Sequence, residues 1–128
     1  MTEARILVVE DNDRNLKLVR DVLVFAGFEV LEAQTGEQGV AIAEMNLPDL
    51  VLMDLQLPGI DGAEALRRLR DNPATAELPV VAVTAFAMKE DGERTRQAGF
   101  DGYITKPLSV RSLPDQVRNY LTRGGAAP

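Results

Sequence analysis

The chain has 128 residues, of which 45% are hydrophobic and 27% charged, the size and composition of one ordinary globular domain. Its 20 acidic and 14 basic residues leave a net charge of −6, which argues against nucleic acid or an anionic membrane surface as the main partner. The chain has neither cysteine nor histidine, so disulfides, thiol catalysis and the usual zinc sites are excluded, and any bound metal must accept oxygen ligands, as Mg²⁺ does.

The first third of the chain predicts a strand, a helix and a second strand. Residues 6–9 are a continuous apolar run, typical of a strand buried on both faces of a parallel sheet. Residues 14–26 have helical periodicity, and Gly27 supplies a stop. One helical face carries Leu16, Val19 and Leu23, and an adjacent face carries Leu18, Val22 and Phe25. Residues 29–33 alternate in polarity, which favours a strand nearer an edge of the sheet.

Capped helices and two further apolar strands follow. Thr35 and Asp61 each have a glutamine or glutamate three residues later, which is the spacing of a capping box and predicts the start of a helix. The apolar runs at residues 50–53 and 80–83 predict two more buried strands. Residues 89–98 predict a further helix, which ends before a glycine.

The last part of the chain predicts a short strand and a helix. Residues 102–105 form the strand, and residues 109–121 have the apolar spacing of the helix. Pro114 would remove a ladder hydrogen bond if the helix began at residue 109. We therefore expect a later start, near Ser112, or a slight bend.

These elements predict a doubly wound α/β domain. Strand and helix alternate five times with short connections, so the strands form a five-stranded parallel sheet with five helices on its two faces and right-handed crossovers. We expect the domain to cover residues 1–122, followed by a short flexible tail at residues 123–128. No apolar stretch approaches the ~20 residues that cross a bilayer, and the N-terminus has no secretory layout, so we expect a cytoplasmic protein.

Polar side chains follow four of the five predicted strands. Glu10 and Asp11 follow the first, Asp54 the third, Thr84 the fourth and Lys106 the fifth. Because ligands bind open α/β sheets beyond the carboxyl ends of the strands, these groups would gather at one edge. Carboxylates there would repel one another by ~4 kcal/mol per pair at about 4 Å, and Mg²⁺ would relieve that repulsion. A metal, an ammonium, a hydroxyl and a carboxylate nucleophile together suit a phosphoryl group.

Each of these residues alone has a plainer explanation. Glu10 or Asp11 could cap the following helix, and Asp54 could simply terminate a strand. Thr84 could serve only as a β-former, and Lys106 could be a solvated surface charge. The prediction depends on all five falling at strand ends of one array.

Four segments resemble the receiver domain of bacterial response regulators, the CheY-like family. They are VVEDN at 8–12, LMDLQLPG at 52–59, VAVTA at 81–85 and YITKP at 103–107. The resemblance covers about residues 4–122 and, among stand-alone receivers, is greatest to DivK-type regulators, although receivers of hybrid sensor kinases share much of it. It implies a sheet with the strand order 2-1-3-4-5 and a part in a two-component phosphorelay.

The resemblance also implies a role for each residue of the site. Asp54 would accept a phosphoryl group from the phosphohistidine of a sensor histidine kinase or a histidine phosphotransferase. Asp11 and Asp54 would bind Mg²⁺ with the backbone carbonyl of Gln56, and Glu10 would act through a metal-bound water. Lys106 would contact a phosphoryl oxygen. The chain would then be a phosphoacceptor rather than an enzyme.

Further residues would respond to phosphorylation. Thr84 would swing its hydroxyl toward the phosphate, Tyr103 would rotate inward, and Pro107 would follow a cis peptide. We expect no output domain to follow, so a downstream protein would bind the face made by the helix at 89–98, the strand at 102–105 and the last helix. Phe86, Met88 and Tyr103 offer apolar anchors there. Phe86 is also bulky beside the path of attacking water, which predicts slow self-dephosphorylation; it could equally be apolar surface that faces a partner.

Other classes of protein fit less of the pattern. A haloacid dehalogenase-like phosphatase also uses an aspartate after a parallel strand, but it has a second aspartate where this chain has Gln56. A flavodoxin relative would have a phosphate loop rich in Ser, Thr and Gly after the first strand. A receiver-like domain that binds partners without phosphorylation, or a receiver excised from a larger regulator or hybrid kinase, stays open.

Overall fold

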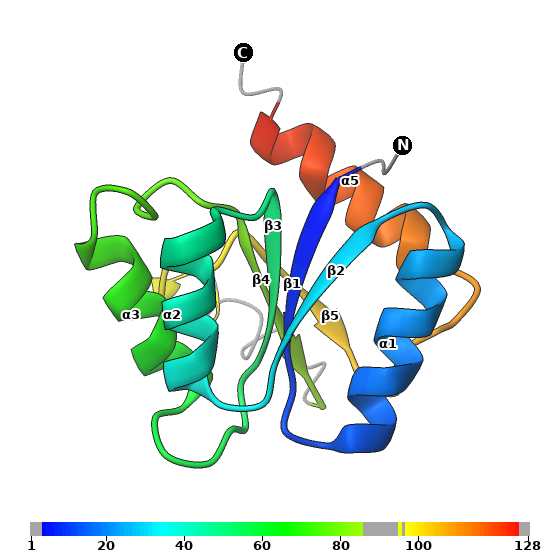
Figure 1. Ribbon diagram of the computed structural model, residues 1–128, viewed down its shortest axis with the longest axis horizontal. Coiled ribbons are helices and arrows are strands. Elements are labelled where there is room, and N and C mark those ends of the chain that lie inside the picture. The colour runs from blue at the N-terminus through cyan, green and yellow to red at the C-terminus, as the bar shows by residue number, and fades with distance from the viewer. Residues whose placement is uncertain (1–3, 86–94, 96, 126–128) are drawn as a thin grey trace.

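The computed structural model describes residues 4–85, 95 and 97–125. The chain forms a parallel β-sheet with helices on both faces (Figure 1). The strands are β1 (Arg5–Val9), β2 (Glu29–Ala33), β3 (Leu50–Asp54), β4 (Val80–Thr84) and β5 (Gly102–Thr105). They pair in the order β2-β1-β3-β4-β5, and every pair is parallel. The predicted fold class and strand order are therefore confirmed.

Helices α2 and α3 cover one face of the sheet, and α1 and α5 cover the other (Figure 1). Their bounds are α1 (Asp13–Phe25), α2 (Gly36–Asn46), α3 (Gly62–Asp71) and α5 (Leu113–Gly125). Most of the predicted helix at 89–98 lies outside the described residues, which contain the other four of the five predicted helices. None of the helices in the described ranges is long and apolar enough to span a membrane.

Two hydrophobic cores lie on opposite faces of the sheet, because alternate residues of each central strand point to opposite sides. On the side of α1 and α5, the core consists mainly of Ile6, Val8, Leu16, Val19, Leu23, Leu50, Leu52, Val81, Val83, Leu113 and Val117. On the side of α2 and α3, it consists mainly of Leu7, Val9, Val40, Ala43, Val51, Met53, Ala65, Leu66, Leu69, Val80 and Ala82. Burial on both faces explains why the central strands are continuous apolar runs.

The two apolar faces predicted for α1 have different environments. Leu16, Val19 and Leu23 are buried in the core. On the adjacent face, Leu18 is 42% exposed and Phe25 is 93% exposed. Val22, the third residue of that face, packs against the core. The face is therefore apolar surface at Leu18 and Phe25.

The predicted caps are present at the starts of α2 and α3. The Thr35 hydroxyl accepts a hydrogen bond from the Gln38 backbone N–H at 3.0 Å, and the Asp61 carboxylate accepts one from the Glu64 backbone N–H at 2.9 Å. In a full capping box, the side chain three residues after the cap also accepts a hydrogen bond from the cap's own backbone N–H. At α2, the Gln38 side chain instead accepts one from the Gln34 backbone N–H. These caps fix where each helix starts, directly after a loop at the carboxyl edge of the sheet.

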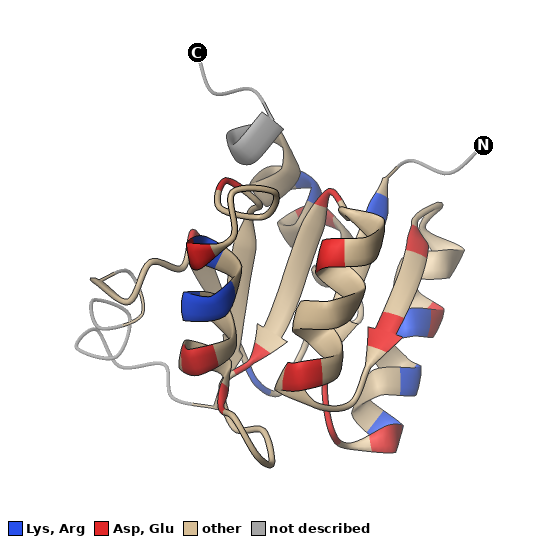
Figure 2. Cartoon of the chain, turned by 60° about the vertical axis from the view of Figure 1, so that its left-hand side comes forward, with Lys and Arg blue, Asp and Glu red and all other residues tan. Residues whose placement is uncertain are grey.

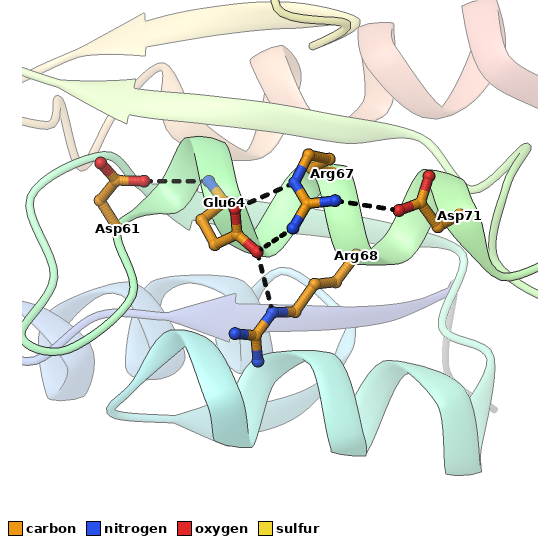
Figure 3. Close-up of polar contacts among 5 residues, drawn as sticks. All are labelled: Asp61, Glu64, Arg67, Arg68 and Asp71. Atoms are coloured by element: carbon orange, nitrogen blue, oxygen red, sulfur yellow. Dashed lines mark hydrogen bonds and ion pairs between the residues drawn. The ribbon is translucent and has the colours of Figure 1, made fainter.

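Glu64 instead joins a chain of ion pairs along α3 that reaches Asp71, which Figure 3 shows together with the cap at Asp61. Its carboxylate lies 2.6 Å from Arg67 Nη2 and 3.0 Å from Arg68 Nε, and Arg67 also pairs with Asp71. Hydrogen bonds from Arg67 and then Arg68 lower the pKa of Glu64 to about 2. Because the pairs are exposed, their contribution to the free energy of unfolding is small.

Helix α5 begins later than residue 109, as Pro114 predicted. Leu113 is its first residue, so Pro114 lies in the first turn, where the missing N–H has no helical partner to lose. The Ser109 hydroxyl accepts a hydrogen bond from the Ser112 backbone N–H at 3.2 Å in the preceding turn. The helix continues to Gly125, beyond the expected end at Leu121.

Candidate functional site

The carboxyl end of the sheet brings together the polar groups that end the strands. Asp54 and Thr84 are the last residues of β3 and β4, and both are buried, at 3% and 5% exposed. Glu10, which directly follows β1, is also buried, whereas Asp11 is exposed. In Figure 2, β3 is uncharged along its length and acidic at its tip. The predicted gathering of these residues at one edge is therefore observed.

Asp54 lies at the centre of the site and is bonded at both carboxylate oxygens. The Lys106 Nζ donates to its Oδ2 at 2.8 Å, and the Gln56 backbone N–H donates to its Oδ1 at 3.0 Å. Lys106 Nζ also lies 3.2 Å from Glu10 Oε1. The Lys106 ammonium group therefore offsets part of the negative charge of both buried carboxylates, Asp54 and Glu10.

Lys106 is positioned by the backbone that continues β5. Its N–H donates to the Thr84 carbonyl at 2.7 Å, which extends the pairing of β4 and β5 past the end of the strand. The Lys106–Pro107 peptide is cis, as the family resemblance implied. The lysine therefore comes from the chain beyond β5 and reaches across to the ends of β3 and β1.

Glu10, Asp11 and Asp54 form an acidic cluster. One carboxylate oxygen from each residue lies within 4.8 Å of the others. The Asn12 backbone N–H donates to Glu10 Oε2 at 3.1 Å, and the Asn12 side chain caps α1. The plainer explanation that Glu10 or Asp11 caps this helix is therefore wrong. Three carboxylates at this separation fit a hard divalent cation such as Mg²⁺.

The cluster shifts two pKa values in the metal-free protein. Burial raises the pKa of Glu10, and the nearby Asp54 carboxylate raises it further, against the opposing effects of the Asn12 N–H and the Lys106 charge. Burial alone would lower the pKa of Lys106, but its hydrogen bond to Asp54 and the charges of Asp54 and Glu10 outweigh that effect and raise it. Lys106 is therefore a permanent cation at neutral pH.

The remaining predicted residues lie on β5 or outside the described ranges. Tyr103 on β5 is half-buried and packs against the core on the α2 and α3 side. The Tyr120 hydroxyl of α5 donates to the Tyr103 carbonyl at 3.2 Å. Phe86 and Met88 lie outside the described residues.

An apolar surface beside the site was missed by sequence reasoning. A hollow of about 360 Å³ is lined by Asn15, Leu18, Ala85, Lys106, Pro107 and Leu108. A second hollow of about 460 Å³ lies further along α1 and is lined by Asp21, Val22, Phe25, Ala26, Val110 and Pro114. The available signal was the second apolar face of α1, whose Leu18 and Phe25 stay outside the core.

Comparison with known proteins assigns the chain to a family. The model of the response regulator receiver domain matches residues 6–118. The chain belongs to this family. The receiver is 43% identical over 116 residues to the polar-differentiation response regulator DivK of Brucella ovis, a match that covers 91% of this chain and 94% of that protein. The DivK-type resemblance predicted from the sequence is thereby confirmed.

Solved structures show the same fold. A response regulator from Chloroflexus aurantiacus superposes with a TM-score of 0.87 at 35% identity, covering 94% of this receiver and 98% of that chain. The receiver domain of a sensor histidine kinase from Pseudomonas aeruginosa superposes with a TM-score of 0.84 at 34% identity, covering 92% and 97%. That structure has a magnesium ion coordinated in its active-site cleft. Receiver domains bind Mg²⁺ in an acidic pocket, and this receiver has an acidic cluster, Glu10, Asp11 and Asp54, at the carboxyl end of its sheet.

Proposed function

We propose that this receiver accepts a phosphoryl group on Asp54 from the phosphohistidine of a partner in a two-component phosphorelay, and that the modification switches a protein-binding surface. One observation carries the proposal: Asp54 is a buried carboxylate at the ligand-binding edge of the sheet, 2.8 Å from the Lys106 ammonium and grouped with two further carboxylates. A carboxylate in this setting is a nucleophile with a cation already in place beside it. The chain has no histidine of its own, so the donor imidazole belongs to the partner.

In the proposed transfer, a carboxylate oxygen of Asp54 attacks phosphorus and forms the new P–O bond. The bond between phosphorus and the imidazole nitrogen breaks, and the imidazole leaves with the electron pair and takes up a proton. The product is an acyl phosphate, whose hydrolysis returns the carboxylate and resets the switch. The chain thus acts as a phosphoacceptor rather than as an enzyme.

The neighbouring residues have distinct parts in this transfer. Lys106 contacts a phosphoryl oxygen. Asp11 and Asp54 would hold Mg²⁺ together with the Gln56 backbone carbonyl, and Glu10 would act on the ion indirectly, through water. The ion would supply positive charge beside the transferring group. The short distances between the carboxylate oxygens of Glu10, Asp11 and Asp54 support these roles.

The partner that carries the phosphohistidine docks over the two hollows along α1. The first hollow includes Lys106 and therefore opens next to the phosphoacceptor. Leu18 and Phe25 are exposed on the same side of α1 and would become buried beneath the partner. An apolar surface that adjoins the reacting carboxylate can hold the donor in line with it. We propose that the exchange takes place in the cytoplasm, where a histidine kinase obtains its phosphoryl group from ATP.

The output surface lies on β5, α5 and the predicted helix at 89–98, with Phe86 and Met88 as apolar anchors. Phosphorylation draws the Thr84 hydroxyl toward the phosphate, and Tyr103 then rotates inward. The hydrogen bond from Tyr120 to the Tyr103 carbonyl supports this assignment, because it connects the switch residue to α5. Phe86 slows hydrolysis of the phosphate, so the switched state is long-lived.

Intact-mass spectrometry tests the proposed function directly. The full chain is incubated with Mg²⁺ and a small phosphodonor and compared with Asp54→Asn and with Asp71→Asn, which removes an exposed carboxylate at the far end of α3. Wild type and Asp71→Asn should each gain one phosphoryl group, and Asp54→Asn should gain none. A phosphorylated Asp54→Asn protein would refute Asp54 as the acceptor. No gain in wild type, with an NMR spectrum that beryllofluoride leaves unchanged, would instead favour a phosphorylation-independent interaction domain.

A further inference from the structure

Two loops at the carboxyl end of the sheet carry the proposed Mg²⁺ ligands. The loop between β1 and α1 carries Asp11, and the loop between β3 and α3, residues 55–61, carries Gln56. The segment at residues 34–37, which links β2 to α2 and forms the first two residues of α2, carries no proposed ligand. It nevertheless contacts the first residue of α1 and the loop after β3, so it is able to set the distance between them.

Gln34 joins this segment to the start of α1, directly after the loop that follows β1. Its side-chain Nε2 donates to the carboxylate of Asp13, the first residue of α1. Its backbone N–H donates to Gln38 Oε1 at 3.0 Å, which holds Gln34 against α2. Because Asp13 lies two residues after Asp11, these bonds tie the first turn of α2 to the segment that carries a proposed ligand.

Gly36 joins the same segment to the loop after β3. A Cβ built on Gly36 would lie 2.6 Å from Ile60 Cγ1 and 3.0 Å from the Ile60 carbonyl oxygen, too close for a real contact. Ile60 has little room to retreat, because it packs against the core on the α2 and α3 side. The glycine therefore allows the loop to lie directly on the first turn of α2.

The loop after β3 is held at both of its ends. At the start, the Gln56 N–H donates to Asp54 Oδ1 at 3.0 Å. At the end, a Cβ on Gly62 would lie 2.6 Å from the Asp54 carbonyl oxygen, so α3 begins in close contact with the end of β3. A displacement of Ile60 must therefore be absorbed between residues 56 and 60, where the Gln56 carbonyl lies.

We propose that residues 34–37 act as a brace for the Mg²⁺ site, and that Gly36 and Gln34 are its positioning residues. The brace fixes the two ligand-bearing loops relative to each other without touching the ion. This inference rests on the proposed function for the role of Mg²⁺, but the brace itself is a property of the metal-free protein.

Alanine substitution at two glycines of α2 separates the brace from general packing. A Cβ on Gly39, one turn after Gly36, would lie 2.7 Å from Val9 Cγ2, almost the same overlap as at Gly36 but against the last residue of β1 rather than against the loop after β3. Gly36→Ala should weaken Mg²⁺ binding about ten-fold, as loss of an outer-shell support typically does. Gly39→Ala should lower the melting temperature but leave Mg²⁺ affinity within about two-fold of wild type.

Hydrogen exchange at Gln56 gives a readout that needs no metal. In the metal-free protein, the Gln56 amide should exchange faster in Gly36→Ala than in Gly39→Ala, because only the first substitution disturbs the loop whose N–H is bonded to Asp54. The double variant Gly36→Ala/Ile60→Ala removes the overlapping side-chain atoms and should recover both the slow exchange and much of the Mg²⁺ affinity. If Gly36→Ala does not fold, Gln34→Ala tests the other arm, because this exposed side chain can be removed without disturbing the core.

The outcomes separate the brace from the proposed function. Equal effects of Gly36→Ala and Gly39→Ala on Mg²⁺ affinity and on Gln56 exchange would overturn the brace, and so would a Gly36→Ala protein that matches wild type in both. A Gln34→Ala protein that binds Mg²⁺ as tightly as wild type would also overturn the brace. A wild-type chain that binds no Mg²⁺ would count against the proposed function, while fast Gln56 exchange in Gly36→Ala alone would still support the brace.

Discussion

Replacing Lys106 by methionine measures how strongly the acidic site depends on the ammonium group that pairs with Asp54 and Glu10. Lys106 Nζ lies 2.8 Å from Asp54 Oδ2 and 3.2 Å from Glu10 Oε1. At an effective dielectric constant of about 20, these attractions amount to about 6 and about 5 kcal/mol before the cost of desolvation. The two carboxylate side chains are only 4% and 5% exposed, so the substitution leaves two buried charges without a cation.

Removing one partner of a buried ion pair lowers the free energy of unfolding by roughly 3–5 kcal/mol. The Lys106 side chain is 24% exposed, and water screens its charge in part, so the lower end of that range applies. We expect Lys106→Met to lose about 3 kcal/mol in the absence of Mg²⁺. Saturating Mg²⁺ should restore part of this loss, because a divalent cation takes over the neutralisation of the carboxylates.

Urea denaturation followed by circular dichroism, at neutral pH with and without EDTA, measures both effects. Lys17→Met is the matched control, because Lys17 is exposed on α1 and its loss should change the free energy of unfolding by less than about 0.5 kcal/mol. A Lys106→Met protein as stable as wild type in EDTA would refute the electrostatic reasoning. So would a loss of stability that Mg²⁺ leaves unchanged.

Three further predictions concern other parts of the receiver. Because burial raises the pKa of Glu10 from 4.5, its stabilising contribution is present below the unfolded pKa and is lost as pH rises through the folded pKa. Glu10→Gln should remove this fall in the free energy of unfolding from urea titrations in EDTA that start at pH 4.5 and proceed upward. Gly102→Ala should lower the free energy of unfolding by about 2 kcal/mol, because a Cβ there overlaps the Tyr120 ring, and adding Tyr120→Leu should recover part of the loss; no recovery would contradict this contact. Leu18→Asp should slow phosphoryl transfer from a histidine phosphotransferase about ten-fold or more while a small phosphodonor reacts at the wild-type rate, and equal slowing with both donors would contradict docking along α1.

The strand ends of the site could be predicted from the sequence because the central strands are buried on both faces. Residues 50–53 and 80–83 are uninterrupted apolar runs, so the first polar residue after each run marks where the chain reaches the edge of the sheet. That rule located Asp54 and Thr84, although both turned out to be the last residues within their strands. The caps at Thr35 and Asp61 are equally local, because each depends on residues at most three positions apart.

Contacts between segments distant in the sequence could not be predicted in this way. The two apolar faces of α1 look alike in the sequence, and only the packing of α5 and the sheet decides that Leu23 is buried while Phe25 is 93% exposed. In the same way, Gly36 could be recognised as the start of a helix, but nothing near it in the sequence identifies Ile60 as its neighbour. A glycine indicates that space is short without indicating what fills it.

The acidic cluster is predictable from the sequence because it opposes the stability of the fold. Glu10 and Asp54 are buried carboxylates, and a chain selected only to fold would have apolar or neutral residues at these positions. Residues that oppose folding at their own positions are typical of functional sites. Once the strand ends are known, the carboxylates there therefore indicate a chemical role. Gly36 and Gln34 do not oppose folding, since each suits the start of an ordinary helix. Residues that position a site without opposing the fold therefore become recognisable only through their contacts in three dimensions.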